Sequence, residues 1–222
     1  MIIYNICENT MKISAITITV LFFLSAGNYA KAQTGVMLGS TYSTAAGDVR
    51  EQYDTGFHQG YAAGVYHNFD LLSEVLGIRP EFSYTEKGYT ANFSSIAVTG
   101  EPIKMEYEYH FHYLILKVPI IYTRNPEDYF SPHFIAGPYA GYRFVAYENV
   151  SGTISNFSGS AKESIEPLDY GLIAGGGGLV DTGPGHLILE LRFNWGLADF
   201  WSQEVGGERF NRGVQLLLGY QF

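Results

Sequence analysis

Strand-like alternation runs through this chain and continues to its last residue. In the final segment, "NRGVQLLLGYQF", every second residue from Val214 to Phe222 is apolar. Successive side chains of a strand point to opposite faces, so a period of two predicts a β-strand with one apolar face. Because the apolar row reaches Phe222, we expect the end of this strand to contact an apolar environment instead of fraying in water.

The same alternation recurs in eight stretches, and an amphipathic helical spacing of three and four residues is not found after residue 34. The connections alternate between long and short, as in outer-membrane barrels. This pattern predicts an all-β fold, an eight-stranded antiparallel up-and-down transmembrane β-barrel with its apolar face outward, long extracellular loops and short periplasmic turns. The expected strands are 34–43, 57–66, 76–88, 107–122, 131–144, 168–180, 185–197 and 211–222.

Each stretch has one face of large apolar side chains and one face of charges mixed with glycine. In "HLILELRFNW", Leu189 and Leu191 share one face, and Glu190 and Arg192 share the other. An eight-stranded barrel has an interior only wide enough to be filled by side chains, so rows of Leu, Phe, Tyr and Trp would overfill it. Four or five outward residues at ~3.3 Å rise also suit the ~25 Å lipid-facing band. We therefore expect the apolar face to contact lipid.

Charged residues on the inward face are the candidates for a site. Buried charges need partners, so a paired network that plugs the lumen is favoured over a polar channel or a proton path. The lumen candidates are Arg79, Glu81, Lys117, Arg143, Asp169, Glu190 and Arg192.

The N-terminal segment predicts export. Met11 and Lys12 precede the uncharged run "ISAITITVLFFLSAG", and Ala30–Lys31–Ala32 offers a small-residue exit. The run is shorter than the ~20 residues of a membrane-spanning helix. We expect a signal peptide at 1–32, with Met11 as a candidate start, and a barrel at 34–222. Cleavage would remove Cys7, the one cysteine, and with it any disulfide or thiol nucleophile.

Composition and loops bear on partners. A net charge of −9 argues against a nucleic-acid surface, which would be basic. Function often resides on loops, and the expected extracellular loops are acidic, with Phe200 and Trp201 in the last one. Divalent cations, lipopolysaccharide or a surface or periplasmic protein are candidate contacts, and a solvated surface is the alternative. The acidic loop residues are Asp48, Glu51, Asp54, Glu148, Glu163, Glu166, Glu204 and Glu208.

A histidine pair raises the question of a metal. His110 and His112 are two residues apart and share a strand face. A tetrahedral site needs three or four ligands, so a third would have to come from elsewhere, such as His58 or a loop carboxylate. The sequence favours the wet end of a strand near a loop, and we expect neither a metal site nor a cofactor.

The C-terminal strand also has implications for the membrane interface and for assembly. Phe222 is expected in a periplasmic girdle of aromatic residues with Tyr66, Tyr122 and Tyr129. An alternating apolar end that closes on an aromatic residue resembles the signal by which barrel-assembly machinery recognises its substrates. In this chain that signal comprises Leu218, Tyr220 and Phe222.

Six segments in order resemble the PorT-like outer-membrane β-barrel family of Gram-negative bacteria. They are "GFHQGYAAGVY", "RPEFSYTEKG", "YLILKVPIIY", "FIAGPYAGY", "LDYGLIAGGGG" and "NRGVQLLLGYQF". The resemblance covers about residues 34–222 and implies an eight-stranded outer-membrane barrel. Its founding member is linked to a protein-secretion system, and the family implies no defined activity and no functional residues.

These observations predict a small outer-membrane barrel protein with a structural or interaction role, in contact with membrane lipid and lipopolysaccharide, and no catalysis. Two alternatives remain at this point. One is a secreted, soluble, lipocalin-like barrel that binds an apolar ligand inside. The other is a lipid-modifying barrel enzyme, which would need a nucleophile with a base; no Ser–His spacing marks one.

Overall fold

The computed structural model describes residues 33–47, 53–72, 74–96, 102–153, 156–160, 166–200 and 208–222. The expected signal peptide at 1–32 lies outside the described residues. Among the described residues, no helix is long and apolar enough to cross a membrane. The strands are β1 Thr34–Gly47, β2 Tyr53–His67, β3 Phe69–Leu72, β4 Leu76–Ile78, β5 Glu81–Ile96, β6 Pro102–Lys117, β7 Ile120–Thr123, β8 Phe130–Gly152, β9 Phe157–Ser160, β10 Leu168–Asp181, β11 His186–Asp199 and β12 Arg209–Gln221.

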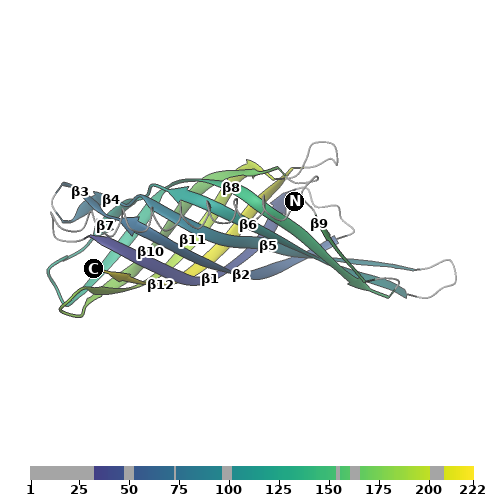
Figure 1. Cartoon of the computed structure of the whole chain (residues 1–222), viewed down its shortest axis with the longest axis horizontal. Coiled ribbons are helices and arrows are strands. Elements are labelled where there is room, and N and C mark those ends of the chain that lie inside the picture. Colours follow the sequence, from purple (N-terminus) through teal and green to yellow (C-terminus); the bar gives the residue numbers. More distant parts are fainter. Residues whose placement is uncertain are drawn as a thin grey trace, which may run out of the picture.

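Eight long strands close into a ring (Figure 1). The first strand, β1, pairs with the last, β12, and β8 pairs with β10, and all the pairings are antiparallel. Round the ring the order is β10, β11, β12, β1, β2, β5, β6 and β8. Closure pairs the backbone groups of each strand on both sides, as lipid requires. The predicted eight-stranded antiparallel barrel is confirmed.

Three short strands continue long ones at the end that carries the short turns, which is the periplasmic end of such barrels. β3 continues β2, β4 continues β5 and β7 continues β6. The register is unchanged from β5–β6 to β4–β7 and from β6–β8 to β7–β8, and β3–β4 shifts between Asp70 and Leu72. Asn68 separates β2 from β3. The break between β4 and β5 falls at Pro80 and the break between β6 and β7 at Pro119, and these prolines have no backbone N–H to donate to the ladder. The expected strands 76–88 and 107–122 are therefore each interrupted once.

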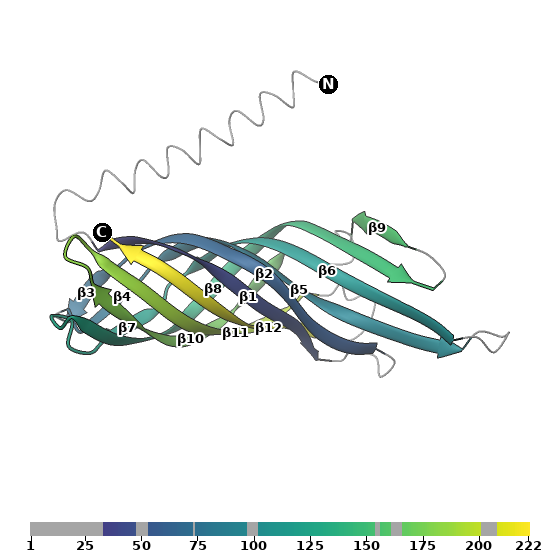
Figure 2. The same cartoon turned by 90° about the horizontal axis from the view of Figure 1, so that it is seen from below.

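At the other end, four strands reach beyond the barrel (Figure 2). β10 leaves β8 at the pair Leu168–Tyr142. Beyond it β8 continues to Gly152 beside β6, β5 and β6 pair as far as Ile96–Pro102, and β9 adds to β8. We call this part of β5, β6, β8 and β9 the sheet extension. Much of two expected loops is thus strand.

The two faces differ as expected. Along β11, Leu189 is 56% exposed and points outward, while Glu190 and Arg192 are fully buried. The apolar face therefore points outward, and the soluble alternative, which needs that face inside, is wrong. The prediction that Tyr66 belongs to the aromatic girdle is also wrong, because Tyr66 is buried on the lumen side with Ala62. Tyr122, Tyr129 and Phe222 are exposed.

Adjacent glycines of β10 provide a test of this orientation. A methyl group on Gly177 would collide with the backbone carbonyl of Leu189, whereas one on Gly176 would meet its nearest atoms, in His133 and Phe134, at 3.2 Å. We expect Gly177→Ala to lower the free energy of unfolding by about 1–3 kcal/mol and Gly176→Ala to change it much less. Unfolding by urea in detergent micelles measures both. Equal effects would contradict the orientation.

Candidate functional site

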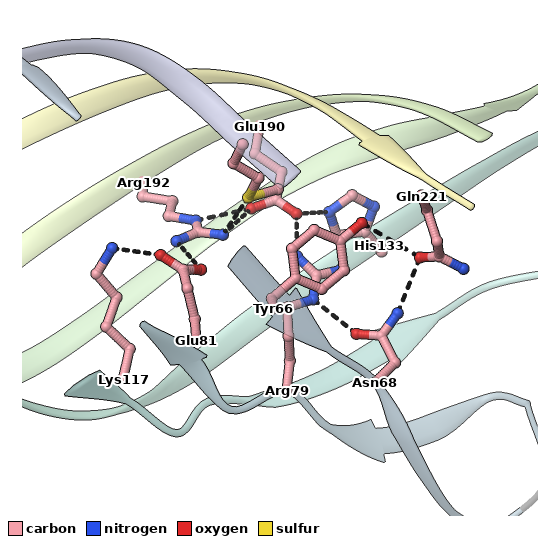
Figure 3. A network of polar contacts seen from close by, with 10 residues as sticks. Tyr66, Asn68, Arg79, Glu81, Lys117, His133, Glu190, Arg192 and Gln221 are labelled. Atoms are coloured by element: carbon pink, nitrogen blue, oxygen red, sulfur yellow. Dashed lines mark hydrogen bonds and ion pairs between the residues drawn. The ribbon is translucent and has the colours of Figure 1, made fainter. Parts of the chain in front are cut away.

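Five of the seven lumen candidates meet in one buried network, which we call the lumen network (Figure 3). Arg192 donates to Glu81 and to Glu190, each at 2.7 Å. Lys117 donates to Glu81 at 2.5 Å, and Arg79 donates to Glu190. All five residues are at most 2% exposed. Three cations therefore share two carboxylates in the periplasmic part of the barrel.

The lumen network spans the bore. Glu81 begins β5, and Arg192 lies on β11, the fourth strand from β5 in either direction round the ring. Their ion pair therefore joins opposite walls. Arg79 reaches the same far wall through Glu190. A solute moving along the axis would have to break these bonds.

Neighbouring polar and aromatic groups also contact these charges. His133 Nε2 lies 2.8 Å from Glu190, and Arg79 donates to the Asn68 side chain at 2.8 Å. The Arg79 guanidinium also lies over the ring of Tyr66, 4.7 Å from its centroid. Gln221 accepts hydrogen bonds from Tyr66 and Asn68. Sequence reasoning missed these groups, although His133 shares the strand face of Arg143.

A sixth candidate, Asp169, belongs to a separate cluster further up the barrel. It accepts a hydrogen bond from Lys87 at 2.7 Å, and from Tyr139 and Asn211 at longer range. Lys87 also lies over the ring of Tyr139, 4.6 Å from the centroid. Sequence reasoning omitted Lys87, which has the same strand parity as Glu81. The seventh candidate, Arg143, is buried and donates to the backbone of Glu166.

An aromatic layer fills the lumen above these charges. Tyr89, Phe111 and Phe200 are buried and in ring contact, with Tyr109 stacked on Tyr89 at 4.7 Å. Phe200, which was expected in an extracellular loop, is thus a core residue. Trp201 and four of the eight acidic loop residues, Asp48, Glu51, Glu163 and Glu204, lie outside the described residues. The two charge clusters and the aromatic layer thus lie at successive levels of the bore.

His58, His110 and His112 lie on the outer wall, where His58 joins His110 as the sequence allowed, and Glu86 takes the place considered for His112. The side chains of His58 and His110 both approach Glu86. One ligand atom from each of these three residues lies within 4.8 Å of the other two. His112 instead lies 2.6 Å from the hydroxyl of Tyr84. Pairing between strands brings this cluster together, so its composition is not visible in the local sequence.

The periplasmic end carries a pocket of about 420 Å³, lined by residues of the β3–β4 hairpin, the β10–β11 turn and the C-terminus. Phe222 lies on its rim, and its ring meets that of Tyr220 at 5.4 Å. Leu218 is 46% exposed on the outer face. The apolar C-terminal row therefore points to the lipid side, and its use as an assembly signal stays a prediction.

The lumen network should contribute strongly to stability. Glu190→Ala removes the carboxylate that Arg79, Arg192 and His133 share, so we expect a loss of about 3–5 kcal/mol in the free energy of unfolding. Arg192→Ala should have a similar effect. Glu127→Ala, in an exposed turn, serves as the control with a change below about 0.5 kcal/mol. Thermal unfolding in detergent measures all three, and an unchanged midpoint for Glu190→Ala would refute a stabilising network.

Three solved barrels are similar to this chain. Neisserial surface protein A gives a TM-score of 0.47 at 12% identity, over 86% of this chain and 96% of its own. Ail, the attachment invasion locus protein of Yersinia pestis, gives 0.42 at 14% identity, over 86% and 99%. OprG from Pseudomonas aeruginosa gives 0.41 at 10%, over 86% and 96%. Comparison with curated proteins gave no match.

A family match covers most of the chain. Residues 25–202 match the family described as "Outer membrane protein beta-barrel domain". The match agrees with the closed ring, the outward apolar face and the buried lumen charges. This chain therefore belongs to the outer membrane protein beta-barrel domain family and resides in the outer membrane.

Proposed function

We propose that this protein is a closed, non-conducting barrel that anchors an interaction surface, the sheet extension, outside the outer membrane. The observation that carries the proposal is the set of ion pairs between opposite walls, such as Glu81–Arg192. A bore occupied by bonded side chains cannot pass solutes, whereas the strands above it offer a rigid platform.

The chemistry of the lumen supports a role without catalysis. A hydrolase needs a nucleophile activated by a base and access to substrate. Glu81 and Glu190 are each bonded to two or more cationic or imidazole groups, and both are buried. Neither is available to act on lipid. The lipid-modifying alternative has no comparable support from the lumen groups.

The surface of the sheet extension supports a role in interaction. Ile96 is 75% exposed and Phe157 is 58% exposed, and both lie beyond the point where the barrel closes. Contiguous exposed apolar patches outside lipid mark interaction sites. On the described residues, β9 pairs with β8 alone, and an open strand edge can pair with another chain. We propose a surface protein or lipopolysaccharide as the partner.

Two further roles belong to the proposal. The C-terminal residues Leu218, Tyr220 and Phe222 would be recognised by barrel-assembly machinery before insertion. The resemblance to the PorT-like family adds an association with protein secretion, in which the sheet extension or the periplasmic pocket would meet a component of the secretion apparatus.

A conductance measurement tests the closed lumen. Purified protein in planar lipid bilayers should show no stepwise current, because the ion pairs of the lumen network join opposite walls of the bore. A general porin reconstituted in parallel serves as the positive control. Reproducible single-channel steps from heat-modifiable, folded protein would overturn the closed-barrel proposal.

Photo-crosslinking tests the interaction surface. A photoreactive residue placed at Ile96 or at Phe157 in living cells should yield discrete adducts with protein or lipopolysaccharide. The same residue at Leu189, in the lipid-facing row, is the matched control and should yield lipid adducts only. Absence of adducts at both extension positions would argue against an interaction surface there.

A further inference from the structure

A histidine–carboxylate cluster lies on the outer wall where the sheet extension leaves the barrel. His110 pairs with Tyr147, five residues beyond Tyr142, the last residue of β8 that pairs with β10. Glu86 follows the outward residue Tyr84 by two positions on β5 and therefore shares its face. Both side chains thus lie outside the lumen, at the base of the sheet extension.

A bulge in β2 positions the third side chain of the cluster, His58. Between Phe57 and Ala62 the strand advances five residues while β5 advances four, from Tyr89 to Thr85. Such an extra residue redirects side chains. His58 is consequently 3% exposed and packed against the outer side of β5. Gly88 makes room for it, because a methyl group there would lie 2.9 Å from the imidazole.

The separations of the donor atoms suit a tetrahedral metal. Glu86 Oε1 lies 3.3 Å from His58 Nε2 and 3.3 Å from His110 Nδ1. Zinc bonds of ~2.0–2.1 Å in tetrahedral geometry place neighbouring ligand atoms about 3.3 Å apart. All three donor atoms lie within 4.8 Å of one another, so small side-chain rotations would complete the set.

A second carboxylate, that of Glu108, contacts both imidazoles on the nitrogen atoms that point away from Glu86. Glu108 Oε1 lies 3.3 Å from His58 Nδ1, and Glu108 Oε2 lies 3.5 Å from His110 Nε2. Each histidine therefore has one nitrogen toward Glu86 and the other toward Glu108. A carboxylate that accepts the outer N–H of a histidine fixes the tautomer whose inner nitrogen can bind a metal. The two carboxylates thus orient both imidazoles.

We propose that His58, His110 and Glu86 bind a zinc ion or another divalent transition metal, with Glu108 as a positioning residue. Two imidazoles and one carboxylate suit metals of this class, whereas Ca²⁺ and Mg²⁺ take oxygen ligands. The fourth coordination position takes water or a group from the medium. A bound ion ties the β2 bulge to β5 and β6 and stiffens the base of the sheet extension.

Titration of zinc chloride into folded, tag-free protein in detergent tests the site. We expect saturable binding of one ion per chain, and no displacement of that ion by excess magnesium chloride. Cobalt(II) at the same site should give the visible absorption of a tetrahedral nitrogen–oxygen complex. His110→Ala and Glu86→Gln should abolish one-to-one binding, and Glu108→Gln should weaken it about 10–100-fold.

His112→Ala is the matched control, since His112 shares the strand face but contacts Tyr84. It should leave zinc affinity and the cobalt spectrum unchanged. Each variant is first checked for the heat-dependent gel shift of a closed barrel. The proposal is overturned if folded wild-type protein shows no saturable one-to-one binding, or if His112→Ala weakens binding as much as His110→Ala.

Discussion

The narrow bore of an eight-stranded barrel imposes the condition that every inward side chain must either be small or find a partner across the axis. Arg192 meets that condition by bonding Glu81 and Glu190 at once. Desolvating these ions costs several kcal/mol each, and the pairing offsets that cost only because the geometry satisfies several donors together. The same bonds tie opposite walls, so the closed lumen and the rigidity of the barrel have one physical origin.

The position of Arg79 shows how backbone breaks serve this network. It lies between β4 and Pro80, and its backbone N–H donates to the carbonyl of Pro119 at 2.9 Å. The two prolines cannot donate to the ladder, so both strands are interrupted at the same height. Because the register is unchanged across each break, the sheet stays closed while Arg79 gains access to Glu190.

Alternation in the sequence predicted which residues share a strand face, and the narrow bore of an eight-stranded barrel predicted which face points inward. The same alternation places Lys87 on the face of Glu81 and Tyr66 on the face of Ala62, so the inward position of both residues follows from the local sequence. The partner of each charge could not be predicted, because it depends on register between strands far apart in sequence. The bulge near His58 shifts the pairing by one residue, and strict alternation therefore fails there.

On the outer wall, the side chains that a strand can carry depend on whether they face lipid. Below the point where β10 leaves β8, an outward polar side chain would face lipid and be costly. Above it, the same strand faces carry Glu86, His110 and Glu108, which lie beyond the last pair between β8 and β10. The length of β8 thus separates a lipid-facing region, which is uniform, from the sheet extension, where individual side chains are free to acquire specific chemistry.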